Sequence, residues 1–228
     1  MLCLRQLAYL FLMLTFIPGT AQVVDRMAAV VNKRVIMESE LDQAIRVELL
    51  LQGKAAPSHL NREVALPVLD QLIDRALLEQ QVLPTDVLTP TPSDLTQRLQ
   101  EARSQIPGAQ TDAGWKALLE DFGLTQQDVE EQLLAEFRML RFVDLRFRGL
   151  VRVDQPAIEN YYQDKLLPEL RRRNAPEPPL RDVSSRIERI LAEQQVDSML
   201  NDWLQTLRAQ AHIEKRLGEP ERPAPEPK

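Results

Sequence analysis

Two histidines are the first residues to consider for chemistry, because imidazole is both a common metal ligand and a general base near neutral pH. His59 lies in a polar stretch, and His212 lies near the C-terminal end of the predicted fold. Neither histidine has a second metal ligand at a suitable spacing. We therefore expect both to be structural or solvated, and the sequence predicts no metal site.

Other patterns that indicate catalysis are also missing from the sequence. It has no glycine-rich phosphate loop and no nucleophile elbow. The one cysteine, Cys3, lies within the predicted export signal, so the rest of the chain has no thiol for a nucleophile or a disulfide. The acidic residues follow the polar faces of amphipathic helices, which is typical of a solvated surface. The sequence thus predicts no catalytic residue, no cofactor and no enzymatic activity.

The composition favours a helix-rich globular protein. Hydrophobic residues make up 44% and charged residues 27% of the 228 residues, which excludes wholesale disorder. There are 7 glycines against 16 prolines, too few glycines for an all-β fold with many tight turns. The formal net charge of −6 argues against nonspecific binding of nucleic acid.

Residues 1–21 are typical of a secretory signal peptide. Arg5 precedes an uncharged apolar run over residues 7–17, and residues 19–21 are small, as a cleavage site requires. The run is shorter than the roughly 20 residues that a membrane-spanning helix needs, which favours cleavage. Retention of the signal as an inner-membrane anchor is the alternative.

Hydrophobic periodicity predicts a mainly helical chain with a small β element. Residues 27–31 and 34–37 form the predicted β-hairpin, and residues 211–217 include a closing strand. Ser39 is the predicted N-cap of the first helix, with Asp42 in capping-box spacing. Thr91, Thr125 and Asp154 are the predicted N-caps of later helices, Thr111 is predicted to start another, and Gly123 is a typical left-handed C-cap site. Helices are predicted over residues 39–53, 64–82, 92–106, 111–123, 125–148, 154–167 and about thirty residues from Leu180.

The predicted helix from Thr125 carries the strongest candidate for a binding surface. Its apolar residues occupy more than one face, as in a helix that is deeply buried or that presents one face to a partner. Core packing is the default interpretation. The alternative is a groove for apolar ligands, which we assign to Phe137, Leu140, Phe142 and Phe147.

The same helix ends in a basic stretch. We interpret these arginines as a solvated face that balances the acidic residues at the other end of the helix. Contact with an acidic partner or a lipid headgroup is the alternative. The arginines of the stretch are Arg138, Arg141, Arg146, Arg148 and Arg152.

Three segments of the chain resemble the SurA-type periplasmic chaperones. Residues 27–41 (MAAVVNKRVIMESEL) are similar to the start of the mature family members, where a strand reading AVVN turns back into V-I/L-x-S-D/E-L and a helix. Residues 68–78 resemble the family's L-x-x-L-I-x-x-x-L-L helix. The segment from Trp203 to Glu214 resembles the closing pattern W-L-x-x-L-R-x-x-A-x-I. The resemblance extends over about residues 24–217.

Two departures from the family pattern matter. Arg34 stands where these proteins often have glycine in the hairpin turn. Family members also usually carry one or two parvulin-type prolyl isomerase domains before the closing helix, and here only residues 174–179 fill that place. Two isolated histidines and no mature cysteine do not supply a parvulin site.

The resemblance implies a domain organisation and a fold. The fold would be mainly α, with N-terminal helices completed by a long C-terminal helix and a small sheet formed by the hairpin and the closing strand. The predicted segments are the signal at 1–21, a helical chaperone domain at 22–173, a Pro-rich linker at 174–179, the closing helix and strand at 180–217, and a disordered Pro/Glu tail at 218–228.

The resemblance also implies a function, namely an ATP-independent periplasmic chaperone. Its partners would be unfolded or nascent outer-membrane polypeptides, with neither nucleic acid nor nucleotide. Two alternatives remain open, a peptidyl-prolyl isomerase and an envelope assembly subunit with one dedicated partner. The sequence does not decide whether two copies pair.

Overall fold

The computed structural model describes residues 25–57, 61–82 and 90–217. The predicted signal peptide at 1–21, His59 and the predicted tail at 218–228 lie outside the described residues.

The described chain is mainly helical with a small antiparallel sheet, so the predicted fold class is confirmed. The elements are β1 (Met27–Val31), β2 (Arg34–Met37), α2 (Glu38–Leu51), α3 (Arg62–Glu79), α4 (Pro92–Gln105), α5 (Asp112–Phe122), α6 (Gln126–Phe147), α7 (Gln155–Tyr161), α8 (Leu167–Arg172), α9 (Leu180–Gln210) and β3 (Ile213–Lys215). A 3₁₀ turn (η2, Arg148–Leu150) follows α6, and a π-helical turn (η3, Tyr162–Leu166) separates α7 from α8.

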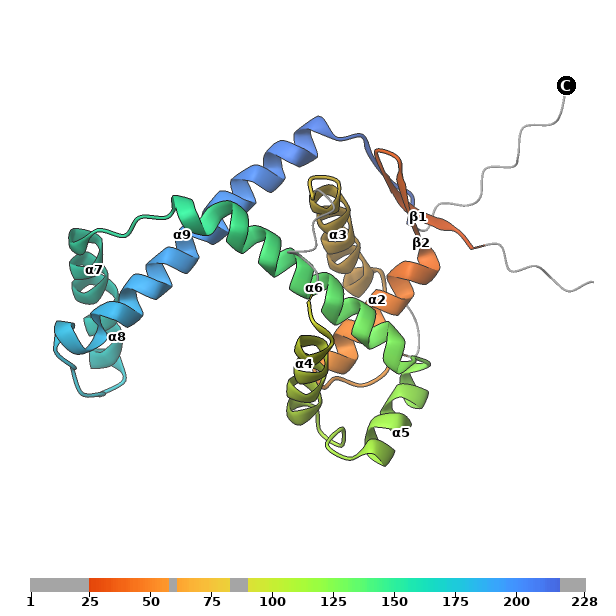
Figure 1. The fold of residues 1–228 in the computed structure, drawn as a ribbon, viewed down its shortest axis with the longest axis horizontal. Coiled ribbons are helices and arrows are strands. Elements are labelled where there is room, and N and C mark those ends of the chain that lie inside the picture. The colour runs from red at the N-terminus through yellow and green to blue at the C-terminus, as the bar shows by residue number, and fades with distance from the viewer. Residues whose placement is uncertain (1–24, 58–60, 83–89, 218–228) are drawn as a thin grey trace, which may run out of the picture.

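The elements form a body and an arm (Figure 1). The body contains the sheet together with α2, α3, α4 and α5, and α6 runs along it and out of it. The arm consists of α7 and α8 beside the N-terminal half of α9. Helix α9 then crosses α6 and returns to the sheet, so that the 31-residue helix connects the end of the arm to the body.

The sheet joins the two ends of the described chain. Its strand order is β2-β1-β3, and both pairings are antiparallel, with Val30 opposite Val35 on one side and Glu214 on the other. Asn32 forms the hairpin turn with φ of 57°, a left-handed conformation that asparagine tolerates well. Arg34 is the first residue of β2, so the turn does not need glycine at that position.

The predicted Ser39 cap is wrong, whereas the later caps are confirmed. Helix α2 begins at Glu38, directly after β2, with no side-chain cap on its first turn. The carboxylate of Asp25 instead accepts hydrogen bonds from the backbone N–H and the hydroxyl of Ser39. Helix starts at Thr91, Thr111, Thr125 and Asp154 have the expected side-chain caps, and Gly123 ends α5 at φ of 63°.

Two prolines lie within helical segments. Pro67 lies in the second turn of α3. Pro168 is the second residue of α8, and the helical segment predicted to end at residue 167 continues through α8 to Arg172. The π-helical turn η3 immediately precedes this proline, which has no backbone N–H to donate to the helix ladder.

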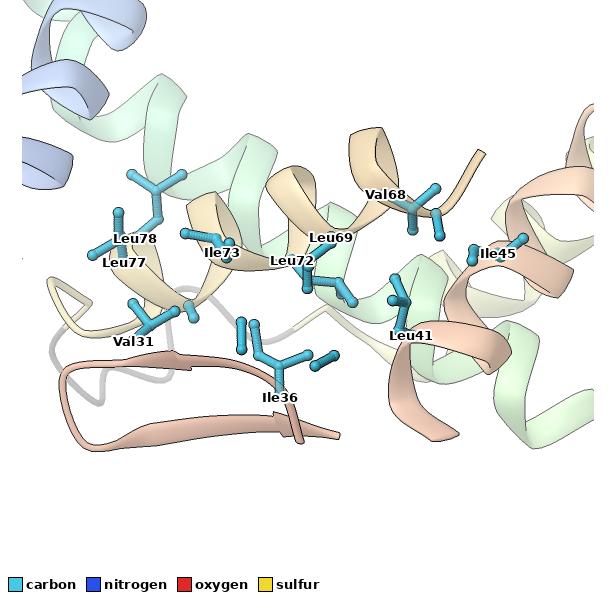
Figure 2. Close-up of a cluster of buried hydrophobic side chains, with 14 of the residues drawn as sticks. Val31, Ile36, Leu41, Ile45, Val68, Leu69, Leu72, Ile73, Leu77 and Leu78 are labelled. Carbon is cyan, nitrogen blue, oxygen red and sulfur yellow. The ribbon is translucent and has the colours of Figure 1, made fainter. Parts of the chain in front are cut away.

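The main core lies between the hairpin, α2 and α3 (Figure 2). Ile36 of β2, Leu41 of α2 and Leu69 of α3 are each at most 1% exposed. Leu207 near the end of α9 belongs to the same cluster. A second cluster joins α2, α4, α5 and α6 around Trp115. Helix α2 therefore contributes to both cores and fixes the N-terminal end of α6.

We expect Leu69→Ala to lower the free energy of unfolding by about 2 to 5 kcal/mol, because it leaves a cavity in this core. Leu145→Ala is a matched control, since Leu145 is 58% exposed, and we expect a change below about 0.5 kcal/mol. Urea unfolding followed by circular dichroism measures both. Equal losses in the two variants would contradict the description of this core.

An ion-pair cluster fixes the end of α9 to α3. Nε of Arg208 donates to Asp74 at 2.6 Å, and its Nη2 donates to the backbone oxygen of Asp70 at 3.1 Å. Lys215 of β3 donates to the Asp70 carboxylate at 2.7 Å. Three elements, α3, α9 and β3, thus meet at two half-exposed carboxylates.

Arg208→Ala should lower the free energy of unfolding by about 1 to 3 kcal/mol, because charge-assisted hydrogen bonds to two aspartates are lost. Arg186→Ala on the same helix is the control, since Arg186 is exposed and makes no ion pair among the described residues. Urea midpoints of the two variants provide the comparison, and a control loss as large as that of Arg208→Ala would count against the cluster.

The same cluster predicts a pH dependence. Burial raises the pKa of Asp70, but the hydrogen bond and charge of Lys215, followed by those of Arg208, outweigh it and hold the pKa below 3.8. A carboxylate with a lowered folded-state pKa stabilises the fold fully above its unfolded value of about 3.9 and loses that contribution as pH falls through the folded value. Asp70→Asn should therefore lose less stability than the unsubstituted protein between about pH 5 and pH 2.5, measured by urea unfolding. An unchanged pH profile would refute this assignment.

Candidate binding groove

The four predicted groove residues lie on two different faces of α6. Phe142 and Phe147 pack on Trp203 of α9, each with ring centroids 5.7 Å from the indole. Phe147 is buried, so this pair belongs to the contact where α6 crosses α9, and neither residue lines the groove described below. Phe137 and Leu140 line an open groove on another face of the helix.

The groove lies between three helices. It has a volume of about 430 Å³, which holds only a few side chains. Its apolar surface comes from Phe137, Leu140 and Val143 of α6 and from Val196 of α9. Leu140 is 58% exposed, so much of its apolar side chain is open to solvent beside the hollow. The remaining lining residues are Arg98 of α4, Arg141, Asp144 and Arg148 of α6 and η2, and Glu193 and Asp197 of α9.

The charged residues that line the groove differ between the helices. The arginines come from α4, α6 and η2, whereas Glu193 and Asp197 come from α9. Nε of Arg148 donates a hydrogen bond to Asp144 of α6 at 2.6 Å, and this bond to the carboxylate raises the pKa of the guanidinium. Arg141, Glu193 and Asp197 make no ion pair with any described residue. The groove therefore presents charges of both signs to a ligand.

Arg146 supports the crossing that shapes the groove. Its guanidinium lies 4.2 Å from the centroid of Trp203 and 5.7 Å from that of Phe147. A cation over an aromatic face is attracted by the ring quadrupole. Arg146 therefore differs from the purely solvated residue expected from sequence, because it covers the aromatic contact between α6 and α9.

The groove residues on α4 and α9 were not identified from the sequence. Val196 is one of many apolar residues of the last helix, and Arg98 is one exposed arginine among many. Their role arises only because α9 returns across α6 and α4 lies beside it. No local sequence signal marks these positions.

The other residues and segments considered for a function lie outside the groove. His212 is exposed, and its Nε2 lies 3.4 Å from Glu214. No group of three His, Cys, Asp or Glu suited to a metal ion occurs within residues 25–57, 61–82 and 90–217. Nor is any described helix long and apolar enough to cross a membrane. The predicted linker at 174–179 is a short turn between α8 and α9, where Pro178 accepts a hydrogen bond from the hydroxyl of Tyr162 at 2.8 Å.

Neither the scan of protein-family models nor the search of curated proteins found a match to this chain. The geometry of the groove allows it to hold a few apolar side chains and to place charges of either sign beside them.

Proposed function

We propose that this protein is an ATP-independent chaperone that binds unfolded polypeptides in the groove between α4, α6 and α9. The observation that carries the proposal is an open apolar surface that includes a Leu140 side chain left 58% exposed. An unfolded chain presents apolar side chains next to charged ones in many orders. A small apolar floor with a rim of mixed charge suits such a ligand, because it favours no single sequence.

Binding in this groove would be weak and reversible. The groove takes only a few side chains, and ordering a flexible client costs conformational entropy for every residue that is immobilised. A chaperone that releases its client without nucleotide needs such a modest affinity. Several grooves or several molecules would then act along one client.

The compartment and the clients follow from the export signal and from the resemblance to SurA-type chaperones. Residues 1–21 would direct the chain to the periplasm and be cleaved there. Outer-membrane protein precursors would be the clients, since they cross that compartment unfolded. The predicted mature chain, residues 22–228, contains every described element.

Two leucines allow a matched test of the groove. Leu140 lines it and Leu145 does not, although both lie on α6 and both are 58% exposed. The assay dilutes a urea-unfolded outer-membrane protein into buffer with the 22–228 chain and follows aggregation by light scattering. Leu140→Asp should raise the concentration needed for half suppression about tenfold, because a leucine contact is lost and a charge enters the groove. Leu145→Asp should leave it unchanged.

Suppression that both variants retain would show that clients bind elsewhere on the molecule. Failure of the unsubstituted chain to suppress the aggregation of several clients would refute the chaperone proposal. Pulldown of one stoichiometric folded partner would then favour a dedicated assembly subunit.

A further inference from the structure

The C-terminal part of α6 and the turn after it form a basic segment in an acidic protein. Residues 137–153 carry five arginines and one aspartate, for a net charge of +4, whereas the whole chain carries −6. Apart from Asp144, the acidic residues of α6 precede this segment, so the charge is divided along the helix. Such segregation concentrates positive potential at one end of the element.

The same segment carries the most exposed large apolar side chains of the described chain. Leu140 and Leu145 are each 58% exposed, and Leu150 in η2 is 65% exposed. Met27, Val35 and Val64 are the next, between 38% and 40%. Basic charge and exposed leucine therefore coincide in one short stretch, although the two observations are independent.

The spacing of these residues indicates what kind of surface they meet. Arg138, Arg141, Leu145 and Arg148 follow one another at three- or four-residue steps, so they lie on one side of the helix. The exposed leucines recur at five-residue steps instead, which turn about 140° around a helix each time. A partner helix needs a continuous apolar stripe, and these leucines do not provide one. Scattered leucines among arginines suit the boundary between lipid headgroups and acyl chains.

We propose that this basic surface, formed by Arg138, Arg141, Leu145 and Arg148, docks on the surface of an anionic phospholipid bilayer. Guanidinium groups bind phosphate in a bidentate manner, and isolated leucines enter the layer below the headgroups. The inference goes beyond the proposed function and does not require it.

Neighbouring acidic groups set the strength of this docking. Asp144 neutralises Arg148 through their ion pair. Hydrogen bonds from Thr91 lower the pKa of Asp94 of α4, and the nearby charge of Arg141 lowers it further. Glu193 and Asp197 of α9 line the groove beside the basic surface. Binding is therefore weak, depends on the anionic lipid fraction and decreases as salt is added.

The test is flotation of the 22–228 chain with vesicles. One set contains phosphatidylglycerol and phosphatidylcholine in equal amounts, and the other contains phosphatidylcholine alone. We expect the chain to float only with the anionic set at low salt. Arg138→Glu should weaken binding about fivefold or more, since each basic residue near such a surface contributes roughly a fivefold effect. Leu145→Asp should also weaken it.

Matched controls keep the result specific. Arg186→Glu makes the same charge change on an exposed part of α9 and should bind nearly as well as the unsubstituted chain. Circular dichroism shows whether each variant is folded. Equal flotation with both vesicle sets, no flotation at all, or an equal loss in Arg186→Glu would each overturn the proposal. Saturable binding to soluble polyglutamate without vesicle binding would also overturn it and indicate an acidic polypeptide partner.

The vesicle and aggregation assays separate the two proposals. Leu140→Asp should impair suppression of aggregation by about tenfold and, because Leu140 is not part of the basic surface, should affect flotation less than Leu145→Asp does. Leu145→Asp should impair flotation and leave lipid-free suppression unchanged. Arg141 and Arg148 also line the groove, so the two surfaces are separated by Arg138 and Leu145, which do not. A variant set in which both activities always fall together would overturn the assignment of lipid binding to these two residues.

Discussion

The pairing of β3 with β1 is the constraint on which the rest of the structure depends. It brings the C-terminal end of the described chain back to the N-terminal hairpin, and the Arg208 and Lys215 contacts to Asp70 and Asp74 hold it there. Because α9 is rigid and 31 residues long, fixing one end also fixes its path across α6. The arm formed with α7 and α8 then projects from the body in a defined direction (Figure 1).

The groove forms because α9 follows this path across α6. Helix α9 packs on α6 through Trp203, Phe142 and Phe147, and Val196 of α9 lines the groove together with residues of α4 and α6. The crossing thus uses Phe142 and Phe147 for structure and leaves Phe137 and Leu140 at the hollow. One helix serves the core on one face and an open apolar surface on another, which explains why its apolar residues are not confined to a single stripe.

Local features were predictable from sequence, and features made by distant segments were not. Capping by Thr91 and Thr125 and the left-handed Gly123 depend on a few adjacent residues, and all were predicted. The Ser39 cap failed because Asp25 supplies the carboxylate from before the hairpin. The groove prediction included Phe142 and Phe147 because periodicity identifies apolar faces of a helix but does not show which face another helix covers. The mainly helical fold itself followed from periodicity together with the poverty in glycine.

The closing strand also determines when this protein can finish folding. The backbone N–H of His212 donates to the side chain of Asn32, 180 residues earlier in the chain. Contacts so distant in sequence form late, since the entropy of closing a long loop is lost before they contribute stability. As the chain is made from the N-terminus, the hairpin, α2 and α3 can pack together early. Leu207 completes their core only when the end of α9 packs against them. Completion of this core therefore requires α9 and β3, and a chain truncated within α9 would expose part of it.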